Sequence, residues 1–198
     1  RFPKHPVIRG LLKKIEYPLA APSANLTTRL SAVSSADVKE DFGKKIKYVL
    51  EGGKSSFGLE STIIDLRNKP TILRLGALEI SSLKKILKKK ISINLNSKKV
   101  LAPGQLKLHY SPGLPIRLNA KNIGDNEAGL FLKKKKELRK NYFYLSKSGS
   151  LNQAAKNLYS TLRKIKKSKF KSIAVEKIPN LGLGKTINDR LIRASRYQ

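Results

Sequence analysis

Residues 18–31 read Pro-Leu-Ala-Ala-Pro-Ser-Ala-Asn-Leu-Thr-Thr-Arg-Leu-Ser, where a short apolar run passes into a loop rich in hydroxyl and amide side chains. Pro22 fixes its own φ and lacks a backbone donor, so the neighbouring hydroxyls and peptide N–H groups can converge on an oxyanion or a base. An ordinary polar turn before a helix is the alternative, because Ser, Thr and Asn also hydrogen-bond their own backbone. The composition of this loop alone leaves both interpretations open.

The residues around this loop predict an α/β fold. Leu19-Ala20-Ala21 is predicted to be a short buried strand, and the polar loop follows its C-terminal end, where α/β sheets usually bind ligands. Apolar residues at 7, 8, 11, 12 and 15 have helical spacing, and Ser34 or Ser35 is suited to cap a helix over 36–42. Further elements are expected as follows: an apolar element at 46–50, a polar glycine-bearing loop at 55–62, a hairpin of strands 63–66 and 71–75, and a helix from 81 or 82 to 90.

The periodic pattern is lost between residues 91 and 114, which we interpret as a linker, and it resumes at residue 115. Strands are predicted near 115–118, 129–132, 142–145 and 172–175, with one helix capped by Ser150 and another from about Thr186. Strands and helices that alternate at this spacing predict a small, mainly parallel α/β layer. The chain is therefore divided into residues 1–90, the linker 91–114 and residues 115–198.

Composition excludes several classes of site. Cysteine is absent and His5 and His109 are the only histidines, so disulfides, thiolate metal sites and a multi-histidine zinc site are not expected. No apolar run approaches the roughly 20 residues that span a bilayer, so we expect a soluble, cytoplasmic protein without membrane contact. The chain contains no methionine and opens at Arg1 within a proline-punctuated segment, from which we expect an N-terminal truncation.

The net charge of +30 at pH 7 suggests a nucleic-acid partner, because Lys and Arg side chains that neutralise phosphates release counterions. The basic residues are, however, spread almost evenly over both halves of the sequence, and the lysine runs 88–90 and 133–136 are typical of solvated faces. Charge alone therefore predicts non-specific association more than a dedicated nucleic-acid site.

Three further motifs are weak by themselves. Gly182-Leu183-Gly184-Lys185-Thr186 has the tail of a P-loop, but Pro179 stands where an earlier glycine of that motif belongs, so we interpret it as a tight turn before a helix. Gly58-Leu59-Glu60-Ser61-Thr62 lacks the glycine pattern of a nucleophile elbow. His109-Tyr110 has three interpretations: an aromatic pin in a structured linker, a catalytic base, or a ligand contact from a lid.

The order of the motifs is more informative than any one of them, because it closely resembles that of the L-threonylcarbamoyladenylate synthase family over essentially the whole chain. The matching segments are 21–25, Ser31, 52–53, 58–65, 73–76, 102–104 with 109–112, and 182–184 with 187–191. The resemblance implies the long form of the family: the C-terminal part of a YrdC-like twisted-sheet α/β domain, a linker, and a small Rossmann-like α/β domain. Thr27-Thr28 and Ser31-Ala32-Val33 depart from the family's usual residues in the first loop.

The resemblance also implies an activity. The family condenses L-threonine, bicarbonate and ATP into threonylcarbamoyl-adenylate with release of pyrophosphate, for the threonylcarbamoyladenosine modification of tRNA. Magnesium is expected with the ATP, and the implied partners are tRNA or double-stranded RNA and a downstream threonylcarbamoyl transferase. A non-catalytic double-stranded RNA or tRNA-binding module is the alternative. The N-terminal half of the family's catalytic domain has no counterpart before Arg1, so we expect these 198 residues to be inactive alone.

Carried over residue by residue, the resemblance implies the binding site as well. The ATP-binding residues would be Ser23, Asn25, Ser31, Arg74, His109 and Tyr110, and the threonine-binding residues would be Arg1, Ala21 and Ser61. No protein nucleophile or resident metal is expected, because adenylation is a displacement at phosphorus that positioning and charge neutralisation accelerate. The linker segment with His109-Tyr110 would close over the site and keep water from the reactive carbamate.

Overall fold

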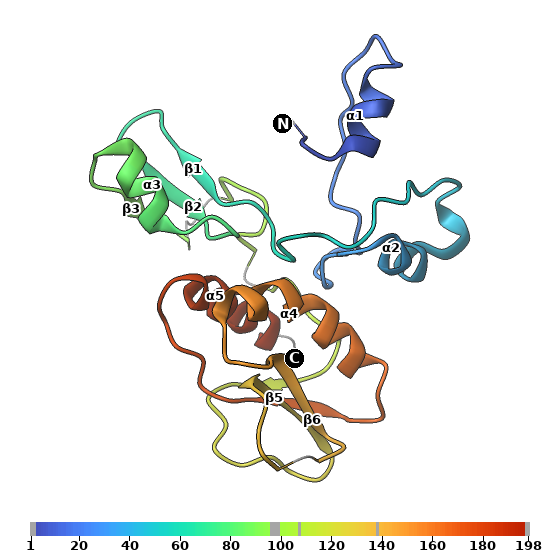
Figure 1. Cartoon of the computed structure of the whole chain (residues 1–198), viewed down its shortest axis with the longest axis vertical. Coiled ribbons are helices and arrows are strands. Elements are labelled where there is room, and N and C mark those ends of the chain that lie inside the picture. The colour runs from blue at the N-terminus through green and yellow to red at the C-terminus, as the bar shows by residue number, and fades with distance from the viewer. Residues whose placement is uncertain (1–2, 96–99, 107, 138, 197–198) are drawn as a thin grey trace.

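The computed structural model describes residues 3–95, 100–106, 108–137 and 139–196 of the chain. Arg1, which the sequence predicts to bind threonine, lies outside the described residues. The described residues form two parts, an N-terminal part (residues 3–95) and a C-terminal part (the described residues from 100 to 196). Figure 1 shows the N-terminal part spread over one side of the more compact C-terminal part.

Local capping signals set the first two helices. α1 (Pro6–Leu12) begins with proline in its first turn, and the His5 side chain accepts from the Val7 N–H at its N-terminus. α2 (Ser35–Phe42) has a capping box in which Ser34 and Asp37 bond each other's backbone N–H, which confirms the predicted cap. A short 3₁₀ turn, η1 (Gly43–Lys45), follows. Neither α1 nor α2 contains a buried residue.

A small three-stranded sheet completes the N-terminal part. β1 (Ile63–Asp65) and β2 (Thr71–Arg74) form the predicted antiparallel hairpin. α3 (Ile80–Leu87) packs its apolar side against β2, and β3 (Ser92–Ile93) pairs with β2 in parallel. β3 lies where the sequence pattern predicts irregular chain, because a two-residue strand among Asn, Ser and Lys carries no periodic signal.

The C-terminal part confirms the predicted parallel α/β layer. Its strands are β4 (Ile116–Arg117), β5 (Glu127–Lys133), β6 (Tyr142–Ser146) and β7 (Ser172–Val175), and they lie in the order β4-β7-β5-β6, all parallel. α4 (Leu151–Lys166) begins at its predicted cap, Ser150. α5 (Leu183–Ser195) begins three residues before the predicted Thr186, directly after Gly182, whose φ is +47°.

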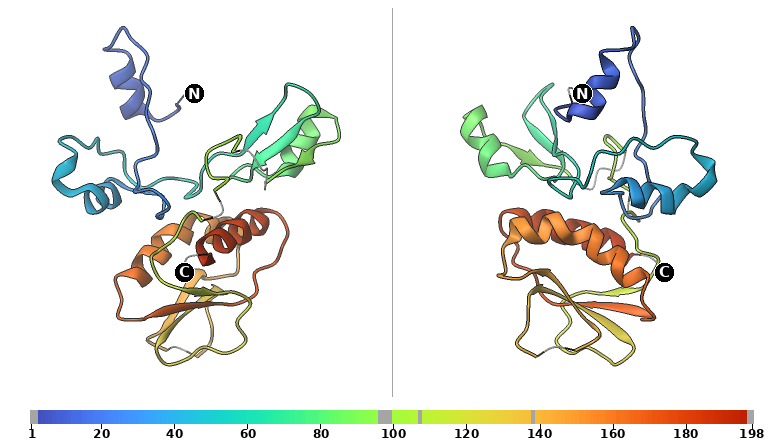
Figure 2. Two further views of the ribbon diagram at one scale, coloured as in Figure 1. Left: turned by 180° about the vertical axis from the view of Figure 1, so that it is seen from behind. Right: turned by 45° about the vertical axis from the view of Figure 1, so that its right-hand side comes forward.

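The two parts share their main core. α4 and α5 lie between the four-stranded sheet and the N-terminal part in both views of Figure 2. Leu30, Val33 and Leu59 of the N-terminal part pack in the same buried cluster as the apolar faces of these two helices. Each helix therefore buries one side against the sheet and contacts loops of the N-terminal part with the other.

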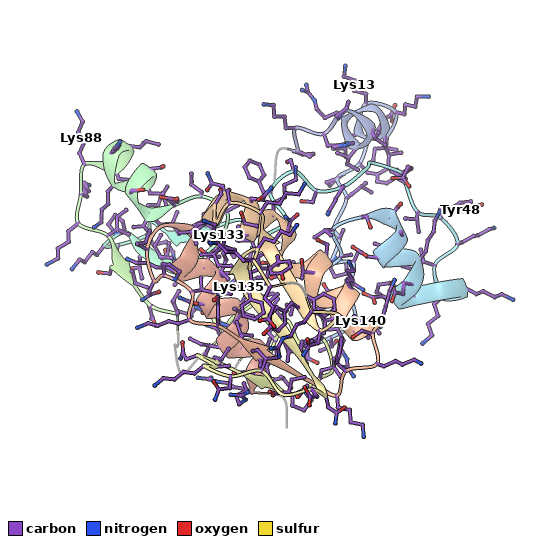
Figure 3. The ribbon with its side chains drawn as sticks, turned by 60° about the horizontal axis from the view of Figure 1, so that its bottom comes forward. Lys13, Tyr48, Lys88, Lys133, Lys135 and Lys140 are labelled. Atoms are coloured by element: carbon purple, nitrogen blue, oxygen red, sulfur yellow. The ribbon has the colours of Figure 1, made fainter. Side chains whose placement is uncertain are left out.

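Two predicted elements do not form in the part of the chain that the structure describes. Residues 19–21 form no strand and are exposed, because no described strand runs beside them to pair their backbone groups. Residues 46–50 form neither a helix nor a strand, and Tyr48 is 78% exposed and points outward in Figure 3. Both predictions relied on apolar composition, which creates an element only where a packing partner exists.

The lysines cover the surface widely, as the even charge distribution predicts. Lys13 and Lys88 extend outward from different lobes of the N-terminal part in Figure 3, while Lys133, Lys135 and Lys140 lie on the C-terminal part. Within the described ranges, no helix is long and apolar enough to cross a membrane.

Candidate functional site at the junction of the two parts

The carboxylate of Glu60 lies at the centre of a polar cluster between the two parts. Glu60 immediately precedes Ser61 in the loop that leads into β1. Ser31 donates its hydroxyl to Glu60 Oε1 at 2.5 Å, and the Tyr159 hydroxyl lies 3.0 Å from each carboxylate oxygen. Arg190 Nε donates to Glu60 Oε2 at 3.1 Å. One carboxylate thus joins the first polar loop (residues 18–31), the second polar loop (residues 55–62), α4 and α5.

Arg190 is the most deeply buried charge of this cluster, with a side chain that is 1% exposed. Its guanidinium forms ion pairs with Glu60 and Asp189 and donates from Nη2 to the carbonyl of Leu75 at 2.6 Å. Its charge also faces the ring of Tyr110, with the Arg190 Cζ 4.6 Å from the ring centroid. A buried arginine needs such complete pairing, because an unpaired charge in the interior is strongly destabilising.

The electrostatics of the cluster fix the protonation of its members. Burial alone would raise the pKa of Glu60, but the charge of Arg190 and the hydrogen bond from Ser31 outweigh burial and lower that pKa. Burial raises the pKa of Tyr159 well above its ordinary value. Near neutral pH, Glu60 is therefore an ionised acceptor and Tyr159 a neutral donor.

Arg74 and Ser61 are brought into direct contact. Arg74 donates from Nη2 to the Ser61 hydroxyl at 3.1 Å and to the Ser61 carbonyl at 2.9 Å. Its Nη1 donates to the carbonyl of Pro103 at 3.2 Å. A residue predicted to contact the nucleotide and one predicted to contact threonine thus share hydrogen bonds, and the chain after β3 is tied to both.

Three other predicted ATP-binding residues meet at a cavity of about 210 Å³. Ser23, Asn25 and Ser31 line it together with Glu60 and Tyr159. Ala21, predicted to bind threonine, is exposed and does not line this cavity.

His109 and Tyr110 lie beside the cluster, and the Tyr110 ring stacks on the Tyr159 ring with centroids 5.9 Å apart. Tyr110 is 1% exposed and has a φ of +63°, a left-handed conformation that a tyrosine rarely adopts. Among the described residues, neither the Tyr110 hydroxyl nor His109 Nδ1 has a hydrogen-bond partner. Burial lowers the pKa of His109, so its ring is neutral near pH 7. The aromatic-pin interpretation describes Tyr110 well.

Three members of the cluster, Glu60, Tyr159 and Arg190, are not among the predicted site residues. Glu60 and Arg190 both lie inside motifs that carry the family resemblance, so their position was a signal. Tyr159 lies in α4 at an inward position of the helical pattern, and that pattern does not indicate its hydrogen bond to Glu60. Within the described residues, no group of three or more His, Cys, Asp or Glu side chains is arranged to hold a metal ion.

Comparison with known proteins identifies the family. The family profile described as "Threonylcarbamoyl-AMP synthase, C-terminal domain" matches residues 78–196. The chain belongs to the threonylcarbamoyl-AMP synthase family. A second profile, Sua5/YciO/YrdC, described as "Telomere recombination", matches residues 1–76. Together the two profiles cover both parts described above.

Relatives of this family align with the whole chain. The threonylcarbamoyl-AMP synthase of Pyrococcus abyssi is 31% identical over 100% of this chain, and that of Bacillus subtilis is 26% identical over 98%. The chain spans 64% and 62% of the length of these two relatives. The crystal structure of P. abyssi Sua5 complexed with L-threonine matches with a TM-score of 0.85 and 27% identity, and covers 100% of this chain and 63% of that one.

Proposed function

We propose that this threonylcarbamoyl-AMP synthase family chain acts in the condensation of L-threonine, bicarbonate and ATP to threonylcarbamoyl-AMP. The observation that carries the proposal is the likeness of the entire chain, including the junction between its parts, to a relative crystallised with L-threonine. In the reaction the threonine amine combines with bicarbonate to give a carbamate and water. A carbamate oxygen then displaces pyrophosphate from the α-phosphorus of ATP.

The junction offers the kind of groups that such a displacement requires. The described residues bring hydroxyls, an amide and a guanidinium to the two polar loops, in Ser23, Asn25, Ser31, Ser61 and Arg74. Orientation of the reactants and neutralisation of phosphate charge are sufficient for nucleotidyl transfer, so no nucleophile on the protein is needed. We assign the loop of Ser23 to ATP, and Ser61 to threonine beside it.

The remaining parts of the reaction are also proposals. Bicarbonate is the carbon donor, and magnesium enters with ATP as part of the substrate, held by its phosphates rather than by a resident cluster of protein ligands. The segment with His109 and Tyr110 shields the reactive carbamate from water, and the burial of the Tyr110 ring between Arg190 and Tyr159 supports this role. The product would pass to a threonylcarbamoyl transferase that modifies tRNA, and the lysine-rich surface would contact that RNA.

The direct test is threonine- and bicarbonate-dependent release of pyrophosphate from ATP by the full product of the gene that contains this chain. Omission of either threonine or bicarbonate should abolish release. Ser61→Ala and Arg74→Ala should each reduce the rate at least tenfold while the fold is retained, as judged by circular dichroism. Full activity in either variant would remove that residue from the site. Release that is independent of threonine would contradict the proposed function.

A further inference from the structure

The hydroxyl proton of Ser31 is committed to Glu60. A carboxylate can only accept hydrogen bonds, so across the 2.5 Å contact the Ser31 hydroxyl must be the donor. A serine hydroxyl has one proton and two lone pairs. Toward the neighbouring cavity Ser31 therefore presents lone pairs only, and acts there as an acceptor.

Two residues of the C-terminal part keep the Glu60 carboxylate in this orientation. Tyr159 donates to it from α4 and Arg190 from α5, and both of these side chains are almost fully buried. Their burial leaves them little freedom to turn away. Ser31 cannot rotate its proton toward the cavity without leaving an ionised, largely buried carboxylate short of one donor, which is costly.

The charge of the cavity points in the same direction. Of the residues that line the 210 Å³ cavity, Glu60 is the one with an ionised side chain, and it is negative. Because Arg190 balances the charge of Glu60, this lining offers a triphosphate no unpaired cation, whereas an amine or a hydroxyl can donate a hydrogen bond to Ser31. The volume suits a nucleobase or a sugar rather than a whole nucleotide.

We propose that Glu60 determines the polarity of nucleotide recognition, by making Ser31 an acceptor for a donor group on the nucleoside of ATP. The cavity then takes the 6-amino group or a ribose hydroxyl, and the triphosphate lies outside it. Tyr159 and Arg190 are positioning residues that act through Glu60, which gives the C-terminal part a role in substrate choice. The inference rests on the proposed function, because it takes ATP as the ligand.

Binding of ATP analogues tests the inference without reference to turnover. Affinities are measured by titration calorimetry for ATP and for three triphosphates that each lack one donor: purine riboside triphosphate, 2′-deoxyATP and 3′-deoxyATP. The full gene product should bind one of the three roughly tenfold more weakly than ATP, the effect of one lost hydrogen bond. Ser31→Ala should bind this analogue and ATP with equal affinity. Ser31→Thr keeps the hydroxyl and should still bind ATP more tightly than the analogue.

The variants of the supporting residues separate positioning from general stability. Tyr159→Phe removes only the hydroxyl that donates to Glu60, and it should reduce the ratio of ATP to analogue affinity severalfold while thermal unfolding shows a folded protein. Equal binding of all four triphosphates by the unaltered protein, or undiminished discrimination by Ser31→Ala, would overturn the inference. Failure of the unaltered protein to bind ATP at all would instead contradict the proposed function from which it starts.

Discussion

At the scale of single residues, Glu60 makes the stability of the protein depend on pH. Its pKa is lower in the folded protein than its ordinary value of 4.5, because the charge of Arg190 and the bond from Ser31 outweigh burial. A lowered pKa stabilises the fold above pH 4.5, and this stability is lost as the pH falls through the folded pKa. Tyr159 and Arg190 are the other titratable groups that contact the carboxylate, and neither changes its charge in this range.

We expect Glu60→Gln to lower the free energy of unfolding at pH 7 by roughly 3 kcal/mol, because it leaves Arg190 with one fewer ionic partner in the interior. The variant should also lose less stability than the unaltered protein between pH 5 and pH 3. Urea denaturation at a series of pH values measures both effects. Parallel pH profiles for the two proteins would show that the fold does not lower the pKa of Glu60.

Some of these residues could be predicted from the sequence and others could not, for physical reasons. Ser31 and Ser61 were predicted to be site residues because each lies in a motif that carries the family resemblance, since the composition of their loops alone also left an ordinary turn open. The contact between Tyr159 and Glu60 joins residues 99 positions apart, and it exists only because α4 lies across both polar loops. An inward tyrosine on an amphipathic helix has the pattern of an ordinary core residue.

At the scale of elements, the loop before β1 packs directly on the backbone of α4. Gly58 has a φ of +71°, and a Cβ there would lie 2.2 Å from the carbonyl oxygen of Lys156. Gly53 has the same φ of +71° but nothing within 4 Å of its Cβ position. Both are costly to replace by alanine because of φ, but only Gly58 would also push the loop away from the helix.

Gly53→Ala should therefore destabilise the protein by about 1 kcal/mol, the cost of the φ alone. Gly58→Ala should cost a further 1–3 kcal/mol, roughly the penalty of overpacking. Hydrogen exchange should increase at residues 55–60 in Gly58→Ala and remain unchanged there in Gly53→Ala. Similar losses in the two variants would mean that the loop does not rest on α4.

Two neighbouring ion pairs connect α2 with the C-terminal end of α4, and one of them is much more buried than the other. Arg163 donates to both carboxylate oxygens of Asp41, at 2.9 and 2.7 Å, and to the carbonyl of Leu30, one residue before Ser31. The side chains of Arg163 and Asp41 are each 5% exposed, whereas Lys167, which pairs with Glu40 one turn along, is 60% exposed. The buried pair is the one expected to position the first polar loop.

Arg163→Met should lower the free energy of unfolding by roughly 3–5 kcal/mol, since it leaves Asp41 buried without its cation. Lys167→Met should change it by less than about 1 kcal/mol, as is usual for exposed ion pairs. Denaturant titration of the two variants provides the comparison. A loss in Lys167→Met equal to that in Arg163→Met would contradict this account of how α2 docks.

Local signals explain which elements the sequence predicted. Ser34 and Ser150 cap their helices through neighbours in the sequence, so both caps were correct. The alternating strands and helices of the C-terminal part bury their own apolar faces, and their parallel layer was also predicted. Residues 19–21 and 46–50 have apolar composition without a described partner, and no local pattern distinguishes that situation from a strand.

At the scale of the whole molecule, the shared core and the Glu60 cluster join the two parts. We therefore expect the two parts to unfold as one unit. Far-UV circular dichroism reports chiefly on α4 and α5, and tyrosine fluorescence sums over seven tyrosines, of which Tyr110 and Tyr159 are buried at the junction. We expect the two signals to change together in a single urea transition. Loss of the fluorescence signal at a lower urea concentration would show that the parts separate before the helices unfold.

The most direct measurement of the central claim is mass-spectrometric detection of the product. The full gene product, incubated with L-threonine, bicarbonate and magnesium-ATP, should form threonylcarbamoyl-AMP, with ¹³C from labelled bicarbonate in the carbamoyl group. The product should be at least tenfold less abundant with Ser61→Ala. Formation of AMP or ADP without the ¹³C-labelled adenylate would contradict the account, as would binding of threonine and ATP with no product.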